Sequence, residues 1–343
     1  MKKMKNWRPS ASLLAGAAVL GLLVLLVPIV RIMRDAVPFS DDYGYGYFAK
    51  LGYLMGKNLP GVLMGVWENV KHTWWTWQGT YSSIFLMSLV PLVWGEQYYF
   101  WGLLFILLLL IGGVFALVKA LVVDVLQGGW QQCLYIQAVT AALVVELMYY
   151  PAEGLFWYNG GIHYVGMHGF AMLLLASLIC LSEGKKGRIR KGLLIAASMI
   201  LSLIVAGSNY VTALQTFLVF LTIMVAGALL HRNIKGLLRL VPAFCVYSIG
   251  FYKNHAAPGN TARAEALGNP GMAPLQAILF SFKEAFSHMW EYTGWMTIVV
   301  MLVLLPMILQ LVSTTKFRFR LPWLLPVWSV CLYATGFTSS LYS

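Results

Sequence analysis

The chain has 343 residues, of which 60% are hydrophobic and only 10% are charged. A water-soluble globule cannot cover so much apolar surface, so this composition excludes a soluble protein. The net charge of +12 is spread over short clusters between apolar runs, which leaves no basic face for a duplex and excludes a nucleic-acid partner. We therefore predict one integral membrane domain over residues 1–343.

Apolar runs recur along the whole chain, and nine of them approach or reach the roughly 20 residues that a transmembrane helix needs. They cover residues 11–31, 98–119, 133–150, 162–181, 192–206, 210–230, 238–252, 295–312 and 321–338. The pattern predicts an all-α, polytopic integral membrane protein with about nine transmembrane helices. We expect the first run to be a retained signal anchor, because it is long for a signal peptide and has no small-x-small cleavage site before Arg31.

Basic residues gather in four of the gaps between these runs: Lys2-Lys3-Lys5-Arg8, Lys185-Lys186-Arg188-Arg190-Lys191, Arg232-Lys235-Arg239 and Lys316-Arg318-Arg320. Cytoplasmic loops are enriched in Lys and Arg. Nine crossings that start from a cytoplasmic N-terminus put all four clusters on the cytoplasmic side. This predicts a multi-pass protein of the plasma (inner) membrane, with its polar segments and its active site on the outer face.

Two large outer loops follow from this topology, residues 32–97 and residues 253–294, with a shorter outer segment at 150–162. Ile84–Trp94 is apolar but has only 11 residues, so we expect an interfacial or re-entrant helix there instead of a crossing. The first outer loop is thus predicted to hold interfacial or juxtamembrane helices. These three segments contain most of the polar side chains that are candidates for catalysis or ligand binding.

The first outer loop begins with an acidic pair, Asp41-Asp42, a few residues beyond the first apolar run. Adjacent side chains diverge in a strand or turn, so one carboxylate can face a pocket while the other makes a structural hydrogen bond or helps bind a cation. A partly desolvated carboxylate is a candidate general base. The alternative is an ordinary turn or N-cap on a solvated loop.

The multi-span layout and the acidic pair resemble the GT-C superfamily of membrane glycosyltransferases, which carry an acidic motif in the first outer loop. The resemblance implies transfer of a sugar from a polyprenyl-phosphate-linked donor to a cell-envelope glycan or lipid acceptor, with inversion. It also implies that Asp41 or Asp42 is the catalytic base. A divalent cation, Mg²⁺ or Mn²⁺, is a possible cofactor, with the same two carboxylates as its candidate ligands.

Aromatic and polar residues alternate further along the first outer loop. Trp74, Trp77 and Gln78 fall within His72–Tyr81. Aromatic rings stack on the C–H faces of sugars and an amide binds hydroxyl groups, so these three are candidate sugar- or acceptor-binding residues. An aromatic belt at the membrane interface is the alternative.

The second outer segment combines an acid, an amide, a histidine and aromatic residues within one short turn. Its candidate sugar- or acceptor-binding residues are Glu153, Trp157, Asn159 and His163. The glycines between them permit close approach of a ligand to the backbone. A zinc site is not expected, because His163 and His168 are five positions apart and do not share a helix face.

The third outer segment contains Lys253, His255, Asn260 and Arg263 around a Pro-Gly turn. We expect Arg263, Lys253 and His255 to bind the donor phosphate and Asn260 to bind sugar, because Arg contacts phosphate bidentately and Lys supplies a point charge. The stretch Ala257-Pro258-Gly259-Asn260 followed by Arg263 also resembles uncharacterised bacterial multispan proteins of GT-C type. The alternative is contact with anionic membrane lipids.

Two other functions stay open at this stage: a transporter or flippase of a lipid-linked or envelope precursor, and another lipid-linked-sugar enzyme such as a polymerase or ligase. A transporter needs polar residues near the bilayer midplane, whereas here they concentrate in the outer segments. The expected partners are therefore a lipid-linked sugar donor, an envelope acceptor and membrane lipids.

Overall fold

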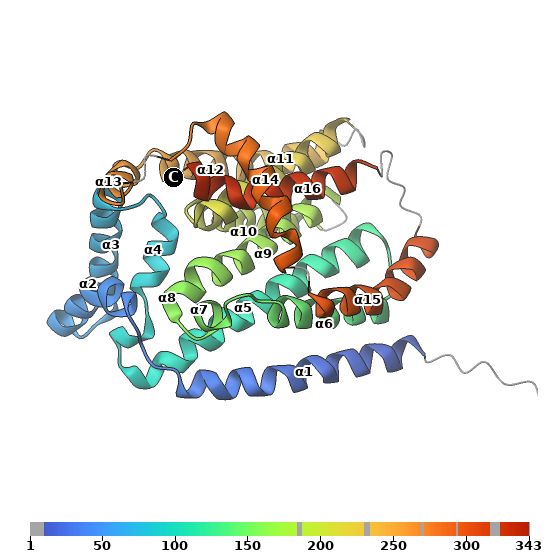
Figure 1. The fold of residues 1–343 in the computed structure, drawn as a ribbon, viewed down its shortest axis with the longest axis horizontal. Coiled ribbons are helices and arrows are strands. Elements are labelled where there is room, and N and C mark those ends of the chain that lie inside the picture. The colour runs from blue at the N-terminus through green and yellow to red at the C-terminus, as the bar shows by residue number, and fades with distance from the viewer. Residues whose placement is uncertain are drawn as a thin grey trace, which may run out of the picture.

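The computed structural model describes residues 10–183, 187–229, 234–268, 271–292, 294–315 and 323–342. Within these ranges every regular element is a helix, and the long helices run roughly along one direction (Figure 1). The all-α prediction is thus confirmed.

Within the described residues, seven helices are long and apolar enough to cross a membrane, which gives the protein the character of a polytopic membrane protein. The spanning stretches are Ala11–Asp35, Glu96–Val125, Tyr158–Glu183, Ile189–Ala206, Tyr210–Ala228, Ile234–Ala266 and Thr297–Thr314. The main helices that form them are α1 (Ala11–Asp35), α5 (Tyr99–Lys119), α9 (Met167–Glu183), α10 (Arg188–Ala206), α11 (Tyr210–Leu229), α12 (Ile234–His255) and α15 (Trp295–Thr314).

The other two predicted runs also form helices, but shorter apolar ones. The run at 133–150 becomes α6 (Trp130–Glu146), which has 17 residues and packs against α1 and α5. Residues 324–338 of the run at 321–338 form the apolar part of α16 (Leu324–Tyr342), whereas residues 321–322 lie outside the described residues. The total of nine crossings therefore stays a prediction.

Helices α5 and α9 pack closely at the centre of the bundle because small residues lie at their crossing. A Cβ atom added to Gly113 would lie only 2.7 Å from the carbonyl oxygen of Gly169. Apolar side chains of α5 such as Leu103, Ile106 and Leu107 are fully buried around this crossing. In contrast, α1 and α15 expose most of their apolar surface, as helices that face lipid do.

One end of the bundle carries the described part of the predicted cytoplasmic clusters. Arg239 at the start of α12 donates to the carbonyl oxygen of Leu181 at the end of α9 over 3.1 Å. Lys119 and Asp124 are 3.8 Å apart at the end of α5. The clusters at 2–8 and 316–320 and parts of the other two lie outside the described residues, and the side that this end faces stays a prediction.

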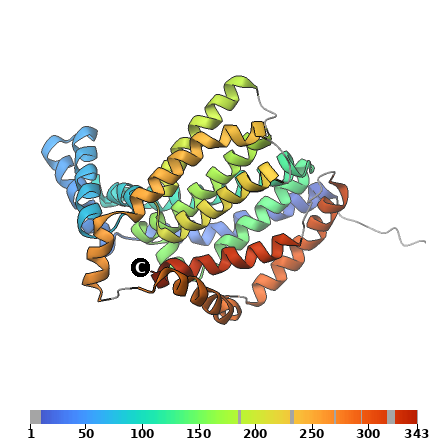
Figure 2. The same ribbon diagram turned by 90° about the horizontal axis from the view of Figure 1, so that it is seen from above.

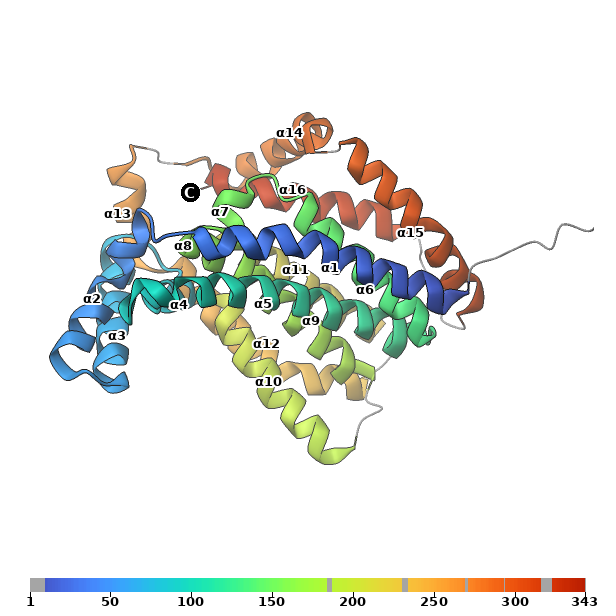
Figure 3. The ribbon, with the colours of Figure 1, turned by 90° about the horizontal axis from the view of Figure 1, so that it is seen from below.

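The opposite end holds the helices of the first outer loop together with α13 (Figures 1 and 2). They are α2 (Asp41–Gly56), α3 (Leu59–Thr76), α4 (Tyr81–Ser88), the short helices η1 (Pro91–Val93) and η2 (Glu96–Tyr98), and α13 (Pro258–Ala266). Helices α2 and α3 form a hairpin that extends beyond the spanning helices (Figure 3).

The apolar stretch Ile84–Trp94 does not form a crossing. Helix α4 has only eight residues and ends before Pro91, after which the chain makes the single turn η1. Ile84, Val90 and Val93 are fully buried, and the stretch packs against α2 and α3. Its hydrophobicity is thus explained by burial inside the protein.

Candidate functional site

The buried carboxylate of Asp42 organises the end of the bundle that holds α2, α3 and α13. Its Oδ2 accepts hydrogen bonds from Tyr99 Oη at 2.6 Å and from Phe39 N at 3.1 Å, and its Oδ1 accepts one from Asn159 N at 3.0 Å. Tyr99 Oη in turn accepts from Tyr158 N at 2.9 Å. Burial raises the pKa of Asp42, an effect that these donors oppose. Asp42 therefore joins the first and second outer segments.

Asp41, in contrast, is exposed at the first position of α2. The preceding Ser40 has a φ of 48°, in the left-handed region that few non-glycine residues adopt. The two adjacent carboxylates thus diverge as the sequence predicts, one into the protein and one to the surface. In this geometry only Asp41 is accessible to a substrate.

The acidic pair does not fit a divalent cation. Both oxygens of Asp42 already accept hydrogen bonds from N–H or O–H groups, which leaves Asp41 as the one available carboxylate of the pair. In the part of the chain that the structure describes, there is no group of three or more His, Cys, Asp or Glu side chains arranged to hold a metal ion.

The second outer segment lies against the acidic pair. Trp157 Nε1 donates to the carbonyl oxygen of Phe39 at 3.1 Å, so Trp157 is anchored beside the start of α2. Asn159 is fully buried, and neither atom of its side-chain amide has a hydrogen-bond partner within the described residues. Glu153 is exposed on α7 (Pro151–Leu155).

His163 occupies a π-helical turn, η4 (Gly161–Gly166), which leads into α9. Such turns widen a helix and are frequent at functional sites. The carbonyl oxygen of His163 accepts a hydrogen bond from Asn209 Nδ2 at 2.6 Å, while its ring atom Nδ1 is buried without a partner in the described structure.

Arg263 of α13 reaches back to the first outer loop. Its Nη1 donates to Gln78 Oε1 at 2.7 Å, and its guanidinium carbon lies 5.5 Å from the ring centre of Trp77. Two of the predicted sugar-binding residues therefore hold this arginine in place.

Tyr45 lies on α2, one helical turn after Asp41, and is linked through Gln78 to Arg263. Burial raises the pKa of Tyr45 to about 12; the negative charge of Asp41 adds to this rise and the positive charge of Arg263 opposes it. Both charges thus act on one phenol. Gln78 Nε2 also donates to Tyr45 Oη at 3.4 Å, so Tyr45, Gln78, Asp41 and Arg263 belong to one polar group, which we name the Asp41–Arg263 cluster.

The side-chain amide of Asn260 has a structural role that we did not predict from the sequence. Its Oδ1 accepts from Gly79 N at 2.9 Å, and its Nδ2 donates to the carbonyl oxygens of Asn254 and His255, both at 2.9 Å. The amide is thus used to join α13 to the loop after α3. The prediction that Asn260 binds sugar is not supported by this geometry.

Two glycines allow the same two segments to touch. A Cβ atom on Gly79 would overlap the carbonyl oxygen of Asn254, and one on Gly259 would lie 2.6 Å from Trp77 N. Backbone approach this close requires glycine.

Lys253 and His255 do not join Arg263 in a single phosphate site. Lys253 is exposed, and its carbonyl oxygen accepts a long hydrogen bond of 3.4 Å from Trp74 Nε1. His255 lines a separate cavity together with Asn260. Of the three predicted phosphate ligands, only Arg263 lies in the Asp41–Arg263 cluster.

Trp74 lines an apolar groove, not a sugar pocket. The groove has a volume of about 490 Å³ and lies between α3, α4, α9 and α10. Its lining is almost entirely aromatic and aliphatic: Trp67, Val70, Lys71, Trp74, Trp75, Tyr81, Ser82, Phe85, Leu86, Phe170, Leu203 and Ile204. Such a lining suits a hydrocarbon chain.

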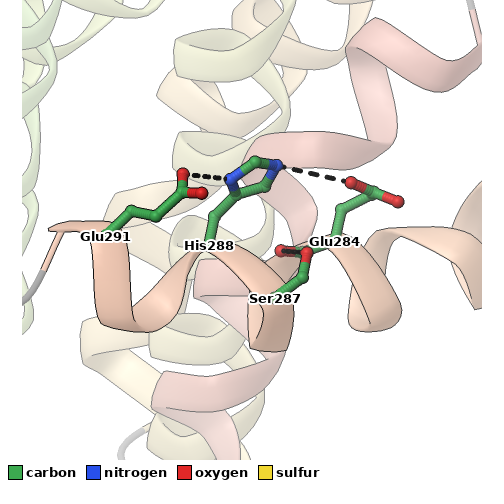
Figure 4. A network of polar contacts seen from close by, with 4 residues as sticks. All are labelled: Glu284, Ser287, His288 and Glu291. Carbon is green, nitrogen blue, oxygen red and sulfur yellow. Dashed lines mark hydrogen bonds and ion pairs between the residues drawn. The ribbon is translucent and has the colours of Figure 1, made fainter.

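A second polar group lies on α14 (Pro274–Tyr292), which packs along α16. His288 stands between two glutamates, with its Nδ1 2.6 Å from Glu291 Oε2 and its Nε2 3.4 Å from Glu284 Oε2 (Figure 4). The ring stacks on Phe337 of α16 at 5.8 Å. The hydrogen bond with Glu291 is the main reason why the pKa of His288 is raised.

Sequence reasoning missed Tyr45 and Tyr99. Tyr45 follows Asp41 by four positions, and residues at this spacing share one face of a helix. The sequence could therefore have predicted that Tyr45 lies near Asp41. This prediction requires that a helix begins at Asp41, whereas we expected a strand or turn there. Tyr99 lies 57 positions from Asp42, and no local pattern joins them.

No protein-family model, curated protein or solved structure matches this chain.

Proposed function

We propose that this protein is a membrane glycosyltransferase that transfers a sugar from a polyprenyl-phosphate-linked donor to a hydroxyl group of a cell-envelope acceptor at the outer face. One observation carries the proposal. Gln78 connects the helix that begins with Asp41 to Arg263, because it donates to Tyr45 of α2 at 3.4 Å and accepts from Arg263 at 2.7 Å. This transfer needs an accessible carboxylate and a fixed guanidinium at the same end of the protein.

In this mechanism Asp41 is the general base. It takes the proton of the acceptor hydroxyl while the oxygen forms a bond to the anomeric carbon of the donor sugar. The bond between that carbon and the phosphate oxygen breaks on the opposite side, and the lipid phosphate leaves with the electron pair. A single displacement of this kind inverts the configuration of the sugar.

Arg263 stabilises the departing phosphate. Its contacts with Gln78 and Trp77 fix the guanidinium before the substrate binds, so little conformational entropy is lost during the reaction. Because Gln78 occupies only one of the five N–H donors of Arg263, other donors are available for a bidentate contact with phosphate.

The apolar groove binds the lipid chain of the donor. Trp74 belongs to the groove and also contacts the backbone of Lys253, next to the third outer segment. A polyprenyl chain in the groove would thus have its phosphate near the outer end of the bundle. The groove volume of about 490 Å³ lies within the range of small-molecule sites, on the order of 300–1,000 Å³.

The test is transfer of a radiolabelled sugar from a polyprenyl-phosphate donor by the purified full chain in liposomes, with an extract of envelope lipids as the acceptor source. We expect product with the natural chain and a loss of at least about 100-fold in Asp41→Asn, because a positioned general base contributes about 10²–10⁴-fold.

A matched control is Glu96→Gln, which also neutralises an exposed carboxylate in the first outer loop but is not at a candidate site residue. Full activity in Asp41→Asn refutes the catalytic role of Asp41. Uptake of the intact lipid-linked sugar across the bilayer without a covalent product refutes the transferase and favours a transporter.

A further inference from the structure

A cavity of about 1,070 Å³ lies on the other side of α13 from the Asp41–Arg263 cluster. Its lining comes from α11, α12, α13, the segment that follows α13, and α16. Its lining combines polar and apolar side chains: Tyr210, Leu214, Phe251, His255, Ala256, Ala257, Pro258, Asn260, Thr261, Ala264, Glu265, Gly268, Met272 and Thr338.

Helix α13 separates this cavity from Arg263. Successive residues of a helix are rotated by about 100°. Thr261, Ala264 and Glu265 therefore share the face that lines the cavity, whereas Arg263 projects from the other side, where it contacts Gln78. A ligand in the cavity and an anion bound by Arg263 would occupy different sites.

The lining has two parts with different chemistry. Hydroxyl, imidazole and carboxylate groups come from Thr261, His255 and Glu265, and they suit hydroxyl groups of a ligand. Leu214, Phe251 and Met272 supply apolar surface, and this suits a hydrocarbon chain. The cavity therefore matches a molecule that is polar at one end and apolar at the other.

The charge of the lining disfavours an anionic head group. Among the described residues that line the cavity, Glu265 is the one acidic side chain, and none is Lys or Arg. A phosphate beside this carboxylate would be repelled. Hydroxyl groups, in contrast, donate hydrogen bonds to a carboxylate, and charge-assisted bonds of this kind are strong.

We propose that this cavity binds a neutral amphiphile with a polyhydroxylated head group, that is, a glycolipid, and that this glycolipid is the sugar acceptor. The acceptor role rests on the proposed transferase function. Binding itself does not, because it follows from the lining of the cavity alone.

The test uses an alkyl glucoside that carries a photoreactive diazirine in its chain. The full chain is placed in nanodiscs of phosphatidylcholine, irradiated with the probe, digested and mapped by mass spectrometry. We expect labelling of the segment 251–268 that unlabelled octyl glucoside competes away. A phosphatidylglycerol probe with the same diazirine should label this segment much less.

Ala264→Trp fills the cavity from α13 and should reduce the labelling at least about tenfold. Ala266→Trp is the matched control, because Ala266 lies on the same helix, is exposed and does not line the cavity. It should label as the natural chain does.

Equal labelling of the two variants overturns the proposal, and so does stronger labelling by the phosphatidylglycerol probe. Asp41→Asn separates the two proposals, because it should label normally whether or not the chain is a transferase. If the natural chain is labelled normally but transfers no sugar, the cavity is still a glycolipid-binding site. Only its role as the acceptor site is then refuted.

Discussion

Arg263 and Gln78 are 185 positions apart in the sequence, yet Nη1 of the arginine donates to Oε1 of the glutamine over 2.7 Å. This contact joins α13 to the loop that follows α3. It also connects Arg263 to the helix that begins with Asp41, because Gln78 donates to Tyr45 of α2.

Replacement of Gln78 by Leu should release Arg263 without removing its charge. A hydrogen bond to a charged group contributes about 1.5–3 kcal/mol, so we expect the KM for the lipid-linked donor to rise at least roughly tenfold. Steady-state kinetics of sugar transfer measure this. Gln97→Leu, at an exposed position on η2, is the control and should leave the KM unchanged. An unaltered KM in Gln78→Leu would show that the contact does not position Arg263.

Asp42→Asn should lower stability, whereas Asp41→Asn should not. An amide at position 42 replaces one acceptor oxygen with a donor NH₂ group that faces N–H or O–H donors, and an unsatisfied buried polar group costs about 1–3 kcal/mol. Thermal unfolding in detergent, followed by intrinsic fluorescence, measures both variants. Equal unfolding temperatures of the two variants would contradict the structural role of Asp42.

Gly79→Ala should destabilise the contact between α13 and the loop after α3. The new Cβ atom would overlap the carbonyl oxygen of Asn254, and overpacking of this kind costs about 1–3 kcal/mol or more. Gly44→Ala is the matched control. Gly44 lies in α2 with no atom within 4 Å of an added Cβ, so alanine should stabilise this helix by about 0.5–1 kcal/mol. Opposite shifts in unfolding temperature are expected, and similar shifts would contradict the close approach.

Helix α14 should become less stable as the pH rises. Glu291 raises the pKa of His288, so the protonated imidazolium is favoured in the folded protein. The stabilisation is fully present below the ordinary histidine pKa of about 6.5 and is lost as the pH rises through the higher folded pKa. Hydrogen exchange of the α14 amides, corrected for intrinsic rates, should therefore show declining protection.

His288→Gln provides the control for this pH dependence. Glutamine does not titrate, so the protection of α14 in the variant should not change over the same pH window. An identical pH profile in the variant and the natural chain would assign the effect to other groups.

The membrane character of the chain and the positions of its long helices follow from sequence alone. An apolar run such as 98–119 is a feature of one continuous segment, so it can be recognised without knowing the tertiary structure. It is also longer than a strand or a short helix of a soluble protein. The divergence of Asp41 and Asp42 is equally local, because adjacent side chains point in different directions.

The tertiary structure decided which polar residues meet. The partners of Asp42, the amide bonds of Asn260 and the contact of Arg263 with Gln78 all join segments that are remote in sequence. It also decided that Ile84–Trp94 packs inside the protein, and that Trp74 lines an apolar groove. The hydropathy and type of a residue indicate which kind of environment its side chain prefers. Only the packing of the helices determines which other residues form that environment.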